Sequence, residues 1–204
     1  IAASHNFTLL ILQRRLSWLA YSSGSDCLQA RASAAPPGPP MPPALPGKAA
    51  LAVINARGGV HGRPIELHSL DDAYEVPRAL SNLEQLLADP DCFALFNCFG
   101  TPMVEAMLPK LNNGNMPFFA PYTGGQVSRV AGARHIFNIR ASYAEEAEKL
   151  VQHLNTLGIK RIAIAYQANS FGKELFNATQ RSMAKLGLPD GPSATVENNA
   201  SDAA

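Results

Sequence analysis

Apolar residues repeat along most of the chain with two different periods, and these periods predict alternating helices and strands. A repeat of three or four positions indicates an amphipathic helix, and a short apolar run between turn residues indicates a buried strand. The predicted helices cover residues 48–56, 77–87, 102 to near 109, 142–157 and 172–186. The predicted strands cover residues 65–70, 93–96, 117–120, 135–139, 161–166 and 194–196. This alternation favours an α/β fold with parallel sheets and right-handed crossovers.

Several turn and capping residues fix where the predicted elements begin and end. Gly58 and Gly59 are expected to end the first helix, because glycine accepts the left-handed conformation of a helix C-terminus. Thr101 is expected to cap the helix that begins at Pro102. Ser142 and Glu145 have the spacing of a capping box.

Residues 1–46 lack these periods and are predicted to form a disordered or irregular, proline-rich leader. Seven of the 16 prolines lie between residues 36 and 46, where they exclude a helix or a central strand. Arg14 and Arg15, followed by an apolar run, faintly resemble a secretory signal. The order of regions and the short apolar core argue against a true signal, which leaves an unstructured or mis-assigned terminus.

Composition and charge exclude several classes of protein. The net charge of +1 gives no electrostatic basis for nucleic acid or an anionic membrane as the main partner. No run approaches the roughly 20 apolar residues of a membrane span. The three cysteines exclude a disulfide-rich scaffold and leave at least one thiol unpaired.

Recognisable catalytic and cofactor motifs are missing from the sequence. It contains no GxGxxG, no phosphate loop, no G-x-S-x-G elbow and no histidine spacing typical of a metal site. Asp71 and Asp72 could serve acid–base chemistry, but a solvated turn or helix cap is favoured. Cys92 and Cys98 are interpreted as buried structural thiols rather than as a metal or redox pair. No catalytic residue, cofactor or metal is therefore predicted.

Two turns have residues suited to ligand binding. In parallel sheets, ligands bind beyond the carboxyl ends of the strands, which directs attention to the segments after residues 96, 120 and 166. Gly100 and Thr101 offer backbone N–H groups and a hydroxyl that suit a carboxylate. Residues 122–124, a Tyr-Thr-Gly sequence, offer a hydroxyl and an aromatic ring. A capped helix and a plain turn remain the alternative.

Six segments then resemble, in order, the leucine/isoleucine/valine-binding family of type I periplasmic solute-binding proteins. They are residues 53–63 (VINARGGVHGR), 70–74 (LDDAY), 99–102 with 117–124 (FGTP, PFFAPYTG), 137–146 (FNIRASYAEE) and 161–172 (RIAIAYQANSFG). The resemblance covers the chain from about residue 47 to its end. It implies two Rossmann-like lobes that close on a ligand, with lobe one at 47–140 and a partial lobe two at 141–204.

The resemblance also implies a function and a site. Lobe-one turns of that family grip the carboxylate and amino groups of the ligand, and they correspond here to Gly100, Thr101, Tyr122, Thr123 and Gly124. Tyr143 and Phe171 correspond to positions near the cleft in lobe two, although packing roles are equally expected for both. The implied protein is extracytoplasmic or periplasmic. It passes an amino acid or amide-like ligand to the permease of an ABC importer.

The sequence also departs from the family, and two other functions stay open. The proline run stands where the family has its first strand, and the second lobe is expected to be incomplete. A ligand-sensing receptor domain of the same fold, coupled to a signalling module, would have the same residues. An α/β enzyme that uses Asp71, Asp72 or Cys98 is the third hypothesis.

Overall fold

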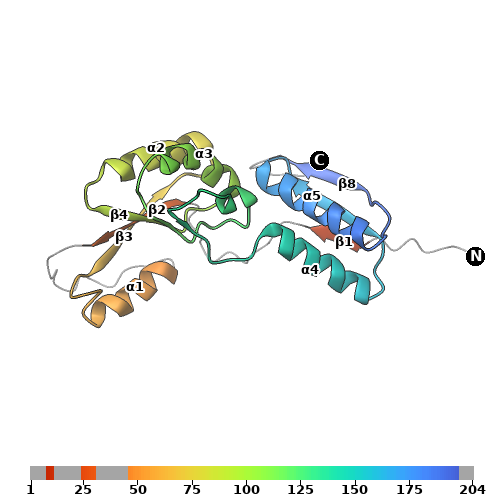
Figure 1. Cartoon of the computed structure of the whole chain (residues 1–204), viewed down its shortest axis with the longest axis horizontal. Helices are drawn as coiled ribbons and strands as arrows, with labels where there is room; N and C mark the ends of the chain where they lie inside the picture. The colour runs from red at the N-terminus through yellow and green to blue at the C-terminus, as the bar shows by residue number, and fades with distance from the viewer. Residues whose placement is uncertain (1–7, 12–23, 31–45, 198–204) are drawn as a thin grey trace, which may run out of the picture. The chain divides into compact units, whose positions relative to one another are not determined.

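A computed structural model describes residues 8–11, 24–30 and 46–197 of the chain (Figure 1). The chain divides into two compact units. The larger unit consists of residues 18–123 and 127–140, and the smaller unit consists of residues 1–17, 124–126 and 141–204. Each unit has its own sheet and its own cluster of buried apolar side chains. The assignment of residues 47–140 and 141–204 to two family lobes stays a prediction.

A five-stranded sheet with the strand order β3-β2-β4-β5-β6 forms the centre of the larger unit. Its strands are β2 (Gly24–Ala30), β3 (Ile65–Asp71), β4 (Cys92–Phe96), β5 (Phe118–Phe119) and β6 (Ile136–Phe137). Its helices are α1 (Pro46–Ala56), α2 (Val76–Ala88) and α3 (Thr101–Asn112). Figure 1 shows α2 and α3 on one side of this sheet and α1 on the other.

The predicted parallel arrangement is found between β4, β5 and β6, but β2 runs antiparallel to both of its neighbours. The expectation of an irregular segment 1–46 is wrong at β2 and at a second short strand, β1 (Thr8–Ile11). The sequence of β2, GSDCLQA, has weak strand propensity. Its pairing with β3 and β4 stabilises it as a strand. The signal-like residues 14–21 and the prolines at 36–43 lie outside the described residues.

Apolar side chains from α2, α3, β4 and β5 form the core of the larger unit. Leu83, Leu95, Met107 and Phe118 are each 0% exposed within it. The helices place these residues inside because their apolar positions follow the three-to-four period. This core holds β4, β5 and α3, and therefore fixes the loops that join them.

The Asn55 side chain fastens α1 to β3. Its Nδ2 donates to the carbonyl of Ile65 at 2.8 Å, and its Oδ1 accepts from the Ile65 N–H at 2.9 Å. The amide thus pairs with Ile65 as a neighbouring strand residue would. In the turn between α1 and β3, position 59 requires glycine, because a Cβ there would lie 2.2 Å from the Arg63 carbonyl oxygen.

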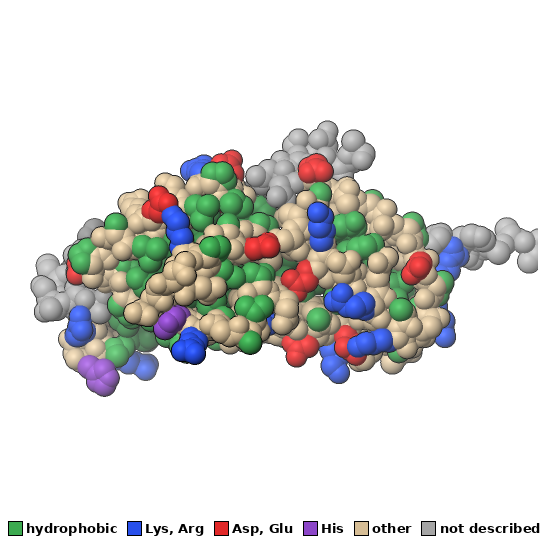
Figure 2. Space-filling model, turned by 45° about the horizontal axis from the view of Figure 1, so that its top comes forward, with side chains coloured by type: hydrophobic (Ala, Val, Ile, Leu, Met, Phe, Trp, Pro, Cys, Tyr) green, Lys and Arg blue, Asp and Glu red, His purple; other side chains and the backbone are tan. Residues whose placement is uncertain are grey.

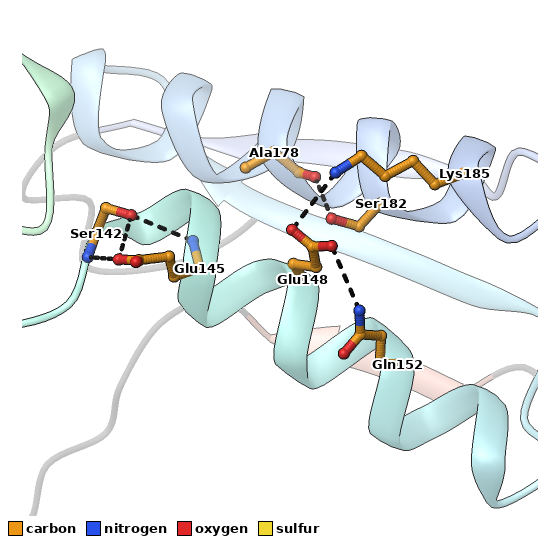
Figure 3. A network of polar contacts seen from close by, with 7 residues as sticks. All are labelled: Ser142, Glu145, Glu148, Gln152, Ala178, Ser182 and Lys185. Carbon is orange, nitrogen blue, oxygen red and sulfur yellow. Dashed lines mark hydrogen bonds and ion pairs between the residues drawn. The ribbon is translucent and has the colours of Figure 1, made fainter.

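The smaller unit contains a parallel three-stranded sheet with the order β1-β7-β8. Its other elements are α4 (Tyr143–Thr156), β7 (Ile162–Gln167), α5 (Ser170–Lys185) and β8 (Ser193–Val196). The predicted capping box at the start of α4 is confirmed: the Glu145 N–H donates to Ser142 Oγ at 3.3 Å and the Ser142 N–H donates to Glu145 Oε2 at 2.8 Å (Figure 3). Figure 3 also shows the ion pair between Lys185 of α5 and Glu148 of α4, at 3.4 Å.

Candidate functional site

The loops that follow β4 and β5 lie side by side at the carboxyl edge of the larger unit's sheet. The parallel pairing continues past the strands, because Phe99 and Tyr122 form a further bridge. The Tyr122 N–H donates to the Cys98 carbonyl at 2.9 Å, and the Gly100 N–H donates to the Tyr122 carbonyl at 3.4 Å. This ladder brings together Gly100, Thr101, Tyr122 and Thr123, the four larger-unit residues predicted to bind a ligand.

The Thr101 and Thr123 hydroxyls bond to each other across these loops. Their Oγ1 atoms are 2.7 Å apart, and the two residues are 1% and 0% exposed. Thr101 was expected to cap α3, but Gly100 occupies the cap position and Thr101 is the first residue of the helix. The Thr101 hydroxyl bonds to Thr123 and does not cap the helix. The pair therefore fixes the spacing of the two loops.

Three aromatic rings and one guanidinium group line the same edge. The Tyr74 and Phe99 ring centroids are 5.8 Å apart, those of Phe99 and Tyr122 are 5.4 Å apart and stacked, and Arg140 lies 5.7 Å from the Tyr122 centroid. Gly100 passes beneath Tyr74, where a Cβ would lie 2.7 Å from Tyr74 Cε2. Sequence analysis did not select Tyr74 or Arg140, although both lie inside family-like segments.

Asp71 ends β3 and Asp72 follows it, and the two carboxyl groups lie in different environments. The exposed Asp71 accepts from the Ala73 N–H at 2.9 Å, and Asp72, which is 0% exposed, accepts from the Tyr74 N–H at 2.9 Å. These bonds hold Ala73 and Tyr74 in the left-handed region, with φ of 50° and 60°. The expectation of a solvated turn is therefore wrong for Asp72. Its Oδ2 is buried and has no hydrogen-bond partner among the described residues, and burial raises the pKa of its carboxyl.

The other three predicted site residues, Gly124, Tyr143 and Phe171, meet in the smaller unit. The Tyr143 N–H donates to the Gly124 carbonyl at 2.8 Å, and a Cβ on Gly124 would lie 2.5 Å from Tyr143 Cδ1. The rings of Tyr143 and Phe171 pack edge to face, with centroids 5.2 Å apart. Phe171 lies in the first turn of α5, which the Asn169 side chain caps by accepting from the Gly172 N–H at 3.0 Å.

Little in the described part of the chain resembles a metal or membrane-spanning site. There, no group of three metal-ligating side chains comes together, and no helix is long and apolar enough to cross a bilayer. Basic and acidic side chains are interspersed on the face that Figure 2 shows. Cys98 is buried and outside any disulfide, as expected, but Cys92 is disulfide-bonded, so the interpretation of Cys92 as a thiol is wrong.

Comparison with known proteins identifies the family. A family model described as "Periplasmic binding protein" matches residues 42–204. The chain belongs to this family. A curated Brucella melitensis relative, Leu/Ile/Val-binding protein homolog 3, is 23% identical over 142 residues, which cover 69% of this chain and 38% of that protein.

Solved structures of periplasmic proteins share the fold. A substrate-binding periplasmic protein from Ralstonia solanacearum superposes with a TM-score of 0.70 at 27% identity, covering 75% of this chain and 43% of that one. A possible leucine/isoleucine/valine-binding protein from Rhodopirellula baltica has the same TM-score and identity, covering 75% and 42%. The chain thus has the type I periplasmic binding protein fold and spans less than half the length of these relatives.

Proposed function

We propose that this chain carries ligand-binding loops of an extracytoplasmic solute-binding protein that delivers an amino acid or amide-like molecule to an ABC permease. The observation that carries the proposal is the meeting of the β4 and β5 loops at one sheet edge, joined by the Thr101–Thr123 hydroxyl bond. Ligands of parallel α/β sheets bind at such an edge. The names of the Brucella and Rhodopirellula relatives direct the choice of ligand to leucine, isoleucine and valine.

The residues at this edge are suited to binding a zwitterionic ligand and less suited to catalysing a reaction. The N-terminal end of α3 presents backbone N–H groups and the positive end of the helix dipole, which favour a carboxylate. The Tyr74, Phe99 and Tyr122 rings supply an apolar surface nearby. We propose a binding role without catalysis, and a small molecule rather than nucleic acid as the ligand.

Calorimetry against leucine, isoleucine, valine, amides and short carboxylates tests the proposal. We expect a binding isotherm with at least one amino acid. Thr101→Val and Thr123→Val should each weaken it about tenfold, because each removes the buried hydroxyl bond that joins the two loops. Thr195→Val, on the exposed face of β8, is the matched control and should leave the affinity unchanged. The absence of heat with every compound would refute the proposal.

A further inference from the structure

Arg129 joins two separate parts of the larger unit's backbone. It ends a short 3-10 helix, η1 (Gln126–Arg129). Its Nη2 donates to the Arg140 carbonyl at 2.7 Å, and its Nη1 lies 3.5 Å from the Thr123 carbonyl oxygen, which is long for a hydrogen bond. Thr123 and Arg140 are the residues at which the two stretches of the larger unit end. A guanidinium group suits this position because its donors form a rigid fork.

The position of Arg129 is itself fixed by its neighbours. Ser128 Oγ donates to Asn138 Oδ1 at 2.8 Å, and Asn138 Nδ2 donates back to the Ser128 carbonyl at 2.8 Å. Arg129 Nη1 donates to Ser128 Oγ at 3.2 Å. Ser128 is 1% exposed, and both bonds of this reciprocal pair are partly buried. It binds η1 to the segment after β6 and aims the guanidinium at the two carbonyls.

Arg140 makes a second connection to the same loop. Its backbone carbonyl accepts from Arg129, while its guanidinium lies over the Tyr122 ring, which stacks in turn on Phe99. Residues 122 and 123 are therefore held to residue 140 through two arginines. A cation above an aromatic ring adds to the hydrogen bonds in holding this arrangement.

We propose that Arg129 is a positioning residue for the ligand site. By tying the Thr123 carbonyl to the Arg140 carbonyl, it sets the place of the Thr123 hydroxyl opposite Thr101. The bonds to Arg140 and Ser128 fix the guanidinium, and its Nη1 contact with the Thr123 carbonyl passes this constraint to the loop. The consequence for ligand affinity rests on the function proposed above, whereas the consequence for the loop does not.

Amide hydrogen exchange of the 204-residue chain tests the effect on the loop without any ligand. The reporters are the Gly100 and Tyr122 amides, whose bonds join the two loops. We expect Arg129→Gln to raise their exchange rates about tenfold, as the loss of a charge-assisted hydrogen bond implies. Arg129→Lys should restore part of the protection, because an ammonium group reaches one carbonyl. Arg134→Gln, at an exposed arginine, is the charge-matched control and should change neither rate.

The pattern of exchange decides between a positioning and a general structural role. Faster exchange of these two amides with unchanged amides in α2 and α3 supports the proposal. Uniform acceleration across the larger unit, or no change at all, overturns it.

Calorimetry with leucine as the probe then tests the link to binding. If the unsubstituted chain binds leucine, Arg129→Gln should weaken the affinity about tenfold and Arg129→Lys by less. An equal affinity despite faster loop exchange would overturn the role of Arg129 in the site. A chain that binds no ligand under any condition refutes the proposed function, while the exchange result still decides whether Arg129 positions the loop.

Discussion

Gly100 combines a left-handed backbone with a close approach to Tyr74 and Met103, so an alanine there should cost stability twice. Its φ is 95°, and a Cβ would lie 2.7 Å from Tyr74 Cε2 and 2.8 Å from Met103 Cε. The left-handed conformation alone costs roughly 1–2 kcal/mol in a residue with a Cβ. We expect crowding to add about 1–3 kcal/mol to the loss from Gly100→Ala. Urea denaturation measures the total.

Gly132→Ala is the matched control for this substitution. Gly132 has a φ of 98°, yet a Cβ there would meet nothing within 4 Å. It should therefore show the backbone cost without the crowding. Equal losses of unfolding free energy at the two positions would contradict the contact between Gly100 and Tyr74.

The buried carboxyl of Asp72 should make stability depend on pH in a direction opposite to that of a salt-bridged acid. Burial raises its pKa above the ordinary value of 3.8, against the lowering effect of the hydrogen bond from Tyr74. The folded protein thus binds the proton more tightly than the unfolded chain does. Its free energy of unfolding falls as pH rises from 3.8 through the raised folded-state pKa.

Asp72→Asn removes this titration and keeps an oxygen that accepts from the Tyr74 N–H. Relative to the unsubstituted chain, we expect the variant to gain stability as pH rises from acid to neutral, measured by urea denaturation across the range. Asp71→Asn, at the exposed neighbour, is the control. A difference between Asp72→Asn and the parent that stays constant with pH would contradict the prediction.

Part of the site could be predicted from single residues, and part could not. Gly100 and Thr123 were selected because a glycine and a hydroxyl side chain directly after buried strands indicate groups that can bind a ligand. The roles of Tyr74, Arg129 and Arg140 depend on tertiary contacts between separate turns and strands. No local pattern encodes such contacts.

Among the elements, the start of α4 depends on one side chain that can be removed cleanly. Ser142→Ala deletes the acceptor of the Glu145 N–H and should cost about 0.5–2 kcal/mol of unfolding free energy. Ser81→Ala is the contrasting control, since this exposed serine lies inside α2, where alanine favours the helix. Thermal and urea denaturation report both changes. A neutral Ser142→Ala variant would mean that packing alone fixes the start of α4.

The helices and most strands of the described chain could be predicted because their signals are local. Apolar periodicity located α2 and α5 within a few residues of their observed ends, and the capping box located α4. β2 could not be predicted, because the backbone bonds of β3 and β4 hold it in place and its own sequence does not favour a strand. The antiparallel pairing of β2 therefore depends on its neighbouring strands and not on a signal in its own sequence.

At the scale of the whole molecule, the two units have separate cores and should lose stability separately. Phe118 is buried in the larger unit's core and Ile162 in that of the smaller unit, each 0% exposed. Phe118→Ala should cost about 3–5 kcal/mol and Ile162→Ala about 2–5 kcal/mol. We expect hydrogen exchange to accelerate in α2 and α3 for Phe118→Ala, and in α4 and α5 for Ile162→Ala.

The two substitutions serve as controls for each other. Exchange that accelerates in both units with either variant would show one cooperative folding unit and would contradict the division. If the two units unfold separately, a single denaturation midpoint for the whole chain cannot be interpreted as a two-state value.

The position of β2 also has a consequence for the order of folding. Asn55 and Ile65 are ten residues apart, and a loop of that length closes within roughly 10–100 ns, so α1 and β3 can meet early. β2 pairs Gly24 with Asp71 and Asp26 with Phe96, across much longer stretches of chain. Until those long loops close, the facing edges of β3 and β4 stay open to strands of other molecules. We therefore expect the pairing of β2 to form late, and a refolding protein to be most prone to aggregate just before that step.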